Sequence, residues 1–330
     1  MISITKSNII YLSTGVILGF SIFLAINSLN PPIENPIIES RNKQNYQFIN
    51  PLLECDSSNS ISTNKNLSEL KKELATIINQ EIDKNNITFA ALYYRDLNNG
   101  PWLGINESEL FSPASLIKVP LMIAYYKLSE KDPSILEKNI TNTKIYNPNE
   151  QNFPPQEYLE PNQTYTVNEL IRRMITFSDN MAYQNLLENI DGNLVYKVYN
   201  DLGVDISQAA QDPSGNIVSV KNYASFYRVL FNSSYLNKDN SEKALELLSH
   251  STFNKGLTSS LPKNIIVSHK FGERQYLETG EKQLHDCGVI YDSKKPYLLC
   301  IMTRGNNFNN AAKTIDIISK TTFNIISKSN

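Results

Sequence analysis

Ser115 and Lys118 have the residue types and the spacing for acyl transfer. The pattern S-x-x-K is weak by itself, since it occurs six times in the chain of 330 residues. Here it follows Ser112 and Pro113, which we interpret as the cap and the first residue of a helix. Residues three apart share a helix face, so the Lys118 amine can lie beside the Ser115 hydroxyl and accept its proton. Pro120 removes a hydrogen bond early in this helix, so its first turn should be irregular.

Lys270 is the second lysine that such chemistry requires. A lysine acts as a base only when burial or another cation lowers its pKa, so a second amine is expected nearby. Lys270 follows an apolar strand at 265–267 and precedes Phe271 and Gly272. An edge strand at this place would line a cleft and offer backbone groups to an extended substrate.

Ser178, Asp179 and Asn180 form the third group. They follow residues 170–175, whose apolar members are spaced as one helix face. We expect Ser178 to relay a proton to a leaving group and the Asn180 amide to hold a substrate carbonyl or amide. We expect Asp179 to stabilise the loop through local backbone hydrogen bonds.

The elements that must position these residues suggest an α/β (α+β) fold. Their order predicts one antiparallel sheet built from both ends of the chain, with the terminal helices on one face and a helical block beside it. The domain should cover 67–330, with a helical subdomain at about 112–250. The expected helices are 67–82, several within 112–248, and 311–326, and the expected strands are 87–94, 102–105, 264–268, 285–291 and 297–303.

Composition narrows the class of protein. Hydrophobic residues make up 41% and aromatic residues 10%, which is typical of a folded domain and argues against disorder. A net charge of −2 gives no basic surface for nucleic acid, so we expect no nucleic-acid partner. The three histidines and three cysteines lie singly, without zinc spacing, so we expect neither a metal nor a cofactor.

The N-terminal region is predicted to export the domain. Residues 8–26 carry no charge and are long enough to cross a hydrocarbon core of roughly 30 Å. Lys6 precedes the run and no Lys or Arg lies in 27–36, which places the remainder outside the cell membrane. We favour an uncleaved single-pass anchor over 1–27, because no A-x-A site closes the run, and the alternative is secretion after signal cleavage. Residues 28–66, rich in Asn, Ser and Pro, should form a flexible linker.

Cys287 and Cys300 are a possible cross-strand pair. If 292–295 forms the turn of a hairpin, these two residues lie directly opposite each other, within disulfide reach. We prefer two buried thiols, because a loop longer by one residue would break this register. A disulfide between them stays an alternative, because an exported domain lies in a compartment where disulfides persist.

The ordered triple resembles a known superfamily. S-x-x-K at Ser115, S-D-N at Ser178 and a K-T-G-like triplet at Lys270 match the signature of class A β-lactamases and penicillin-binding proteins. The segments 166–187 and 285–305 also look like that family, and the resemblance spans about 67–330. It implies the fold of that family and a serine hydrolase that forms an acyl-enzyme.

The resemblance also implies roles for the residues. Ser115 would attack the carbonyl of a β-lactam or of a D-alanyl-D-alanine stem peptide of peptidoglycan. Lys118 would act as the general base and Ser178 would pass a proton to the departing nitrogen. Lys270 would tune the site and attract the substrate carboxylate. The backbone N–H groups of Ser115 and Glu273 would form the oxyanion hole. Gly272 and Asn180 would complete the substrate site.

Two departures from that signature affect the expected activity. Phe271 stands where a Thr or Ser would contact the substrate carboxylate, and Arg274 or Lys282 could compensate. The stretch 205–218, which matches the loop that carries the deacylating Glu, contains no Glu. Its acids are Asp205 and Asp212, and we expect Asp212 to be a solvated loop acid rather than a deacylation base. A missing base favours a peptidase-like or slow-turnover acyl-enzyme.

Three functions therefore stay open. The first is a class A β-lactamase-type hydrolase, and the second is a D,D-peptidase that deacylates slowly. The third, of a different class, is a non-catalytic wall-binding module that kept the fold. In each case we expect a monomer whose membrane contact is the N-terminal helix.

Overall fold

A computed structural model describes the placement of residues 46–51, 65–98, 100–145, 147, 151–206, 214–292 and 295–328. The predicted anchor at 8–26, Asp212 and most of the linker lie outside these residues. Residues 46–51 of the predicted flexible linker instead pack on the domain, where Phe48 and Ile49 are buried and their N–H groups donate to Glu242. Within the described ranges, no helix has both the length and the apolar character needed to cross a membrane.

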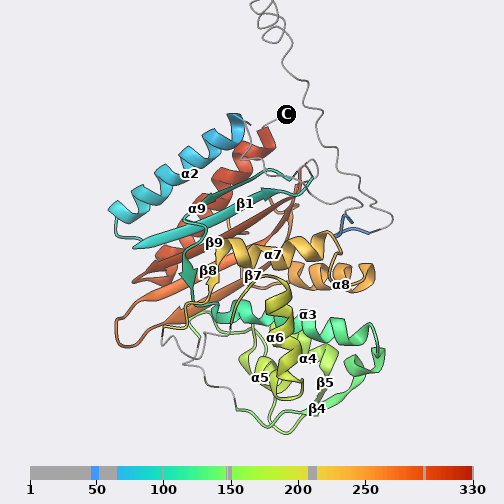
Figure 1. The fold of residues 1–330 in the computed structure, drawn as a ribbon. Coiled ribbons are helices and arrows are strands. Elements are labelled where there is room, and N and C mark those ends of the chain that lie inside the picture. The colour runs from blue at the N-terminus through green and yellow to red at the C-terminus, as the bar shows by residue number, and fades with distance from the viewer. Residues whose placement is uncertain are drawn as a thin grey trace, which may run out of the picture. The chain divides into compact units, whose positions relative to one another are not determined.

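The central element is a five-stranded antiparallel sheet made from both ends of the chain (Figure 1). β1 lies between β2 and β9, so the first strands of the domain pair with the last one. β7 forms one edge of the sheet. This arrangement confirms the predicted antiparallel sheet. In sheet order the strands are β2 (Trp102–Ile105), β1 (Phe89–Asp96), β9 (Tyr297–Gly305), β8 (Lys282–Tyr291) and β7 (Ile266–Gln275).

Two helices cover one face of the sheet. α2 (Lys65–Asp83) and α9 (Phe308–Lys328) lie side by side on it (Figure 1). Leu70 and Leu74 of α2 are buried because they recur on one side of the helix, and Ile315 of α9 is buried against the same face. The terminal helices therefore cover one face together, as the apolar spacing predicts.

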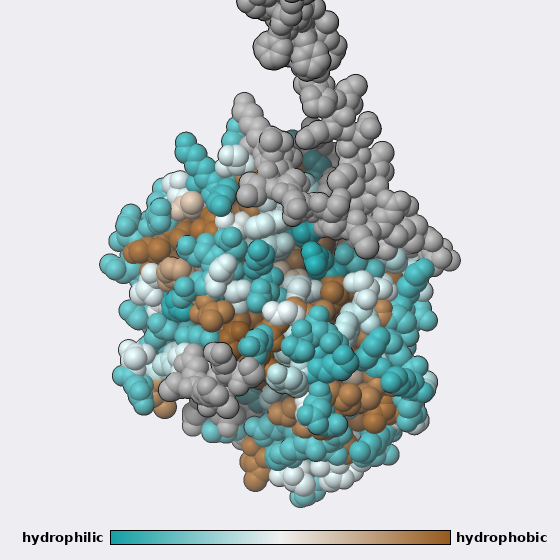
Figure 2. All heavy atoms as spheres, viewed as in Figure 1, coloured by the Kyte–Doolittle hydropathy of each residue, from teal (hydrophilic) through white to brown (hydrophobic). Residues whose placement is uncertain are grey.

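The remaining helices lie on the other face of the sheet and beside it, around a second apolar core. Two short two-stranded sheets join them, β3 (Leu110–Phe111) with β6 (Val218–Ser219) and β4 (Asn139–Thr141) with β5 (Thr164–Thr166). Hydrophilic residues cover much of the face drawn in Figure 2, and apolar residues appear there in small groups. The helices are η1 (Ala114–Ile117), α3 (Lys118–Ser129), η2 (Pro133–Glu137), α4 (Val167–Thr176), α5 (Asn180–Glu188), α6 (Gly192–Asp201), α7 (Val220–Phe231) and α8 (Lys238–Ser249).

The hairpin of β7 and β8 is longer than the sequence predicts. Both strands continue past their apolar parts, and Gln275 pairs with Lys282 near the turn. Lys270 therefore lies inside β7 rather than after a strand, which corrects the prediction. The polar residues of this extension show no apolar alternation, so only their pairing across the sheet reveals them as strand.

Cys287 and Cys300 form a disulfide. They face each other in the β8–β9 register, and Ile290 opposite Tyr297 shows that the connecting loop preserves this alignment. The preference for two thiols was therefore wrong, although the predicted register is correct. In the pairing of β7 with β8, Lys270 lies opposite Cys287. Lys270 and the two disulfide cysteines therefore lie in one row across the sheet.

Candidate active site

Ser115 lies in an irregular turn that leads into a long helix. The turn is the 3₁₀-helix η1, and α3 begins only at Lys118, which confirms the irregular start that Pro120 predicts. Ala114 has φ of 47°, a left-handed conformation that a non-glycine residue adopts only under constraint. Ser115 itself is half-buried.

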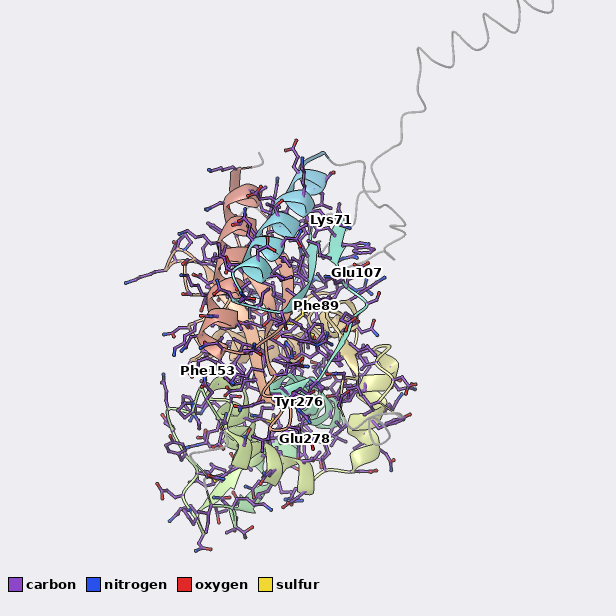
Figure 3. All side chains as sticks on the ribbon, turned by 90° about the vertical axis from the view of Figure 1, so that its left-hand side faces the viewer. Lys71, Phe89, Glu107, Phe153, Tyr276 and Glu278 are labelled. Carbon is purple, nitrogen blue, oxygen red and sulfur yellow. A yellow bond between two sulfur atoms is a disulfide. The ribbon has the colours of Figure 1, made fainter. Side chains whose placement is uncertain are left out.

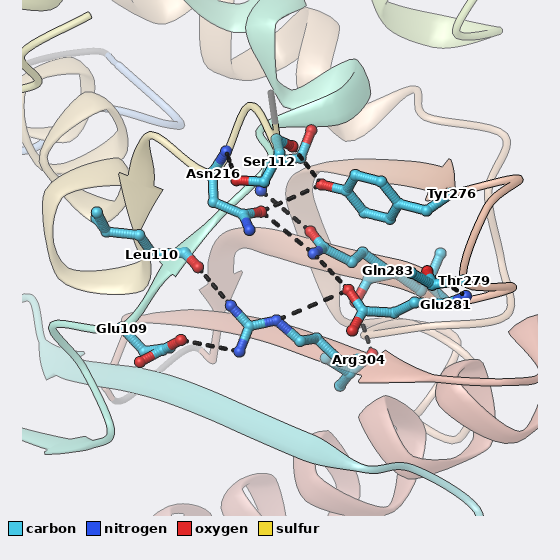
Figure 4. A network of polar contacts seen from close by, with 12 residues as sticks. Glu109, Leu110, Ser112, Asn216, Tyr276, Thr279, Glu281, Gln283 and Arg304 are labelled. Atoms are coloured by element: carbon cyan, nitrogen blue, oxygen red, sulfur yellow. Dashed lines mark hydrogen bonds and ion pairs between the residues drawn. The ribbon is translucent and has the colours of Figure 1, made fainter. Parts of the chain in front are cut away.

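The chain before this turn is anchored to the sheet. Ser112 does not cap a helix, which corrects the prediction, because its backbone and side chain bond elsewhere. Its N–H donates to Gln283 Oε1 at 3.0 Å, and its carbonyl accepts from His285 Nε2 at 2.9 Å. Burial lowers the pKa of His285 to about 3, so this ring is neutral and donates. Arg304 donates to the Leu110 carbonyl at 2.6 Å, which extends the network of Figure 4.

Gly272 lets β7 pack directly against the turn that carries Ser115. A Cβ at this position would lie 3.0 Å from the Pro113 carbonyl oxygen and 3.1 Å from the Leu116 nitrogen. Any side chain here would have to push the two segments apart. The close approach brings the edge strand with Lys270 alongside Ser115.

The Lys118 amine is surrounded by acceptors. Its Nζ lies 3.1 Å from Ser115 Oγ, 2.7 Å from the Ser178 carbonyl, 3.2 Å from Ser178 Oγ and 2.7 Å from Asn180 Oδ1. The side chain is 1% exposed. The structure thus brings four predicted site residues, Ser115, Lys118, Ser178 and Asn180, within hydrogen-bond distance around one nitrogen.

Burial makes Lys118 a plausible base. It lowers the pKa of this amine to about 7, although the charges of Asp179 and Glu273 act in the opposite direction. At pH 7 such an amine is roughly half neutral, and a neutral amine has a lone pair that can accept the Ser115 proton. The first requirement deduced from the sequence is therefore met.

Ser178 lies between the two lysines. Its Oγ accepts from Lys270 Nζ at 2.9 Å and from Lys118 Nζ at 3.2 Å. Ser178 has φ of 59°, and the following Asp179 caps α5 by accepting from the N–H groups of Met181 and Ala182. The loop-stabilising role predicted for Asp179 is confirmed.

Lys270 is fully buried at 0% exposure. Burial, and next the neighbouring charge of Lys118, hold the pKa of Lys270 well below its usual value. Its Nζ donates to the Phe271 carbonyl at 2.9 Å and lies 4.2 Å from the centre of the Phe271 ring. The charge of Lys118 thus helps to lower the pKa of Lys270, whereas burial alone lowers the pKa of Lys118.

Phe271 belongs to an aromatic cluster beside the site. Its ring stacks on Phe253 with centroids 4.0 Å apart, and Phe153 meets both rings edge-on. Arg274 lies elsewhere: it donates to Ser112 Oγ at 3.3 Å. Lys282 Nζ lies 5.9 Å from the Phe308 ring. In place of the hydroxyl expected at position 271, the protein has a cluster of three phenylalanine rings.

Sequence reasoning missed a segment that reaches both sides of the site. Gln151 Nε2 donates to the Ser178 carbonyl at 3.2 Å, and the Phe153 N–H donates to Glu273 Oε1 at 2.9 Å. Figure 3 shows Phe153 at the level where the sheet meets the helical part. The segment has no periodic pattern, so only the proline pair at 154–155, a turn signal, could have drawn attention to it.

Glu273 contributes a buried carboxylate that the sequence reasoning did not use. Burial raises its pKa, and the Phe153 and Asn152 N–H groups and the two lysines act against this rise. Its Oε2 is buried without a hydrogen-bond partner among the described residues. In the part of the chain that is described, no three His, Cys, Asp or Glu side chains are grouped to hold a metal ion.

Comparison with known proteins places the geometry in context. A profile of the β-lactamase enzyme family matches residues 69–326. No curated protein matches the chain. Among solved structures, PBP-A is 20% identical with a TM-score of 0.66, over 79% of this chain and 97% of that one. The TLA-3 extended-spectrum β-lactamase is 18% identical with a TM-score of 0.68, over 79% and 100%.

Two further solved structures have the same fold. A β-lactamase from Chitinophaga pinensis is 18% identical with a TM-score of 0.65, over 77% of this chain and 99% of that one. A PBP-A mutant, 20% identical with a TM-score of 0.65 over 79% and 97%, was solved as an acyl-enzyme with penicillin G. At these identities the likeness establishes the fold.

Proposed function

The chain belongs to the β-lactamase enzyme family, and we propose on this basis that it is a serine hydrolase in which Ser115 forms an acyl-enzyme. The observation that supports this most is the position of the Lys118 amine, 3.1 Å from Ser115 Oγ and 3.2 Å from Ser178 Oγ. A buried amine at that position can accept the proton of the attacking hydroxyl.

The reaction follows from these contacts. Neutral Lys118 takes the Ser115 proton while Ser115 Oγ attacks the carbonyl of a β-lactam or of a D-alanyl-D-alanine-like peptide. The oxyanion would be stabilised by the N–H groups of Ser115 and Glu273. Ser178 then gives its proton to the departing nitrogen and recovers one from Lys118, to which it is hydrogen-bonded. Lys270, 2.9 Å from Ser178 Oγ, polarises this hydroxyl.

Deacylation separates the two enzymatic alternatives. A β-lactamase hydrolyses the acyl-enzyme rapidly, whereas a D,D-peptidase-like protein holds a β-lactam adduct. Asp212 lies outside the described residues, and 205–218 contains no Glu. The lack of that residue type favours slow deacylation, because a positioned base contributes roughly 10²–10⁴ in rate.

A labelled penicillin and intact-mass spectrometry test the proposal. We expect one covalent adduct at Ser115 in the wild type and none in Ser115→Ala. A long-lived adduct indicates the peptidase-like alternative, and rapid turnover of a chromogenic cephalosporin indicates a β-lactamase. If wild type and Ser115→Ala behave alike and neither reacts, the non-catalytic wall-binding module is the hypothesis that remains.

We also propose that the domain works outside the cell membrane, held by the anchor at 1–27 and the linker at 28–66. The uncharged run at 8–26 supports this, and so does the Cys287–Cys300 disulfide, since disulfides persist in oxidising compartments. Protease added to intact cells should then degrade the domain. Complete protection in intact cells, with degradation after lysis, would contradict the proposal.

A further inference from the structure

We propose that the Glu273 carboxylate occupies the charge position that a substrate carboxylate would otherwise take, so that the site selects acyl donors that are uncharged next to the scissile bond. This inference rests on the proposed acyl-enzyme function and names its substrate class. Suitable donors carry an ester, an amide or no group where common penicillins carry a carboxylate.

The first step is the position of Glu273 in the site. It follows Gly272, the residue at which β7 touches the turn that carries Ser115. Its side chain is held in place, because Oε1 accepts from the Phe153 N–H at 2.9 Å. The Oε2 atom is buried and, within the described ranges, has no hydrogen-bond partner. A carboxylate of fixed position therefore lies on β7, the strand that we expect to bind the substrate.

The second step is electrostatic. The charge of Glu273 stabilises the protonated forms of both Lys118 and Lys270, so it acts as an internal counter-ion for the two amines. Asp179 adds to this effect at Lys118 and Asp286 at Lys270. A substrate carboxylate would meet two amines whose positive charge Glu273 already balances. The negative charge of Glu273 would also repel it, and this repulsion is strong in a site of low dielectric.

The third step concerns the side chains that could receive a substrate carboxylate. Residues two apart on a strand share a face, so Phe271 and Glu273 line the same side of β7. A phenyl ring and a carboxylate donate no hydrogen bond. Arg274 points to the opposite face, where it bonds Ser112 Oγ at 3.3 Å. The side of β7 that carries position 271, where the family signature has a carboxylate-binding hydroxyl, thus presents a ring and a carboxylate, and neither can receive an anion, which is a route to specificity.

The experiment compares benzylpenicillin with its methyl ester, which differ in charge at this group and share the reactive ring. Acylation rates at Ser115 are measured by intact-mass spectrometry on the full-length protein, with Ser115→Ala as the blank. We expect the ester to acylate the wild type at least tenfold faster than the anion, a result that requires no variant.

The second part of the experiment removes the charge of Glu273. Glu273→Gln keeps an oxygen for the Phe153 N–H, and we expect it to raise the ratio of anion rate to ester rate at least tenfold. The matched control is Glu278→Gln, an exposed carboxylate on the same hairpin (Figure 3), which should leave the ratio unchanged. A thermal melt of each variant reports whether it is folded.

Several outcomes overturn the inference. One is a wild type that prefers the anion, and another is a ratio that does not change in a folded Glu273→Gln protein. A third is Arg274→Ala selectively lowering the anion rate, which would make Arg274 the carboxylate receptor. If neither probe modifies Ser115 in any variant, the proposed acyl-enzyme function itself fails, and this outcome is distinct from the other three.

Discussion

The two walls of the site differ in how closely they follow the family signature. One wall, formed by η1, α3 and the start of α5, carries Ser115, Lys118 and Asn180, all in the expected types and within reach of one amine. The other wall is β7, where Phe271 replaces a hydroxyl residue and Glu273 adds a buried carboxylate. The proposed nucleophile and its proposed base thus lie on the wall that keeps the signature, whereas both departures lie on the strand that carries Lys270.

The largest loss of acylation rate is expected for Lys118→Ala, on the first wall. Loss of the proposed base should lower the acylation rate at Ser115 roughly 10²–10⁴-fold, measured by intact-mass spectrometry. Lys127→Ala is the control, because Lys127 lies on the same helix α3 with its amine bonded to the Tyr235 carbonyl at 2.6 Å. A rate within threefold of wild type in Lys118→Ala would mean that another group accepts the proton.

The pH dependence of the acylation rate tests the role of Lys118 without replacing it. Burial lowers the pKa of Lys118 to about 7, so its neutral form is lost as pH falls below that value. Acylation by an uncharged probe should level off above about pH 7 and fall about 100-fold by pH 5. Because the charge of Glu273 raises the Lys118 pKa, Glu273→Gln should move the midpoint to lower pH. A flat profile between pH 5 and 8 would contradict this role of Lys118.

Asn180→Ala tests a supporting contact on the first wall. Asn180 Oδ1 accepts from Lys118 Nζ at 2.7 Å, and losing such a bond should slow acylation about tenfold. Asn180→Asp keeps the acceptor and adds a negative charge, so its pH midpoint should move upward instead. Equal, small effects of both variants on rate and midpoint would show that this contact does not tune the amine.

The smallest effect is expected on the second wall, for Phe271→Leu. The ring stacks on Phe253 at 4.0 Å, so the substitution should lower the free energy of unfolding by about 1 kcal/mol. Urea unfolding measures this, and acylation of an uncharged probe should stay within threefold. Leu277→Ala, at an 89% exposed residue of the same hairpin, is the control. A tenfold loss of acylation would assign the ring a part in the reaction.

Much of the fold follows from local patterns in the sequence. The spacing of Leu70 and Leu74 predicts α2, and the alternation of the end strands predicts the sheet. The proximity of Ser115, Lys118 and Ser178 is also predictable, because few residue types can activate a hydroxyl and these would have to lie together. What local patterns could not define was the polar half of β7, because its residues become a strand only through pairing with β8.

The site also contains contacts that no local pattern encodes. The Phe153 N–H and the Glu273 carboxylate are 120 residues apart, and their bond depends on the finished fold. Ser112 resembles a helix cap, yet its hydrogen bonds go to β8 and to Arg274. In each case a long-range partner prevailed over the preference of a short segment.

The pairing of β1 with β9 has a consequence for synthesis. Apart from β2, β9 is the only strand of the five-stranded sheet that pairs with β1, and it spans Tyr297–Gly305, far along the chain from Phe89–Asp96. A ribosome must therefore translate every residue from Asp96 to Tyr297 before the early hairpin gains its neighbour. Such non-local closure is slow compared with local helix formation. We expect the nascent polypeptide to stay inert until β9 has been translated.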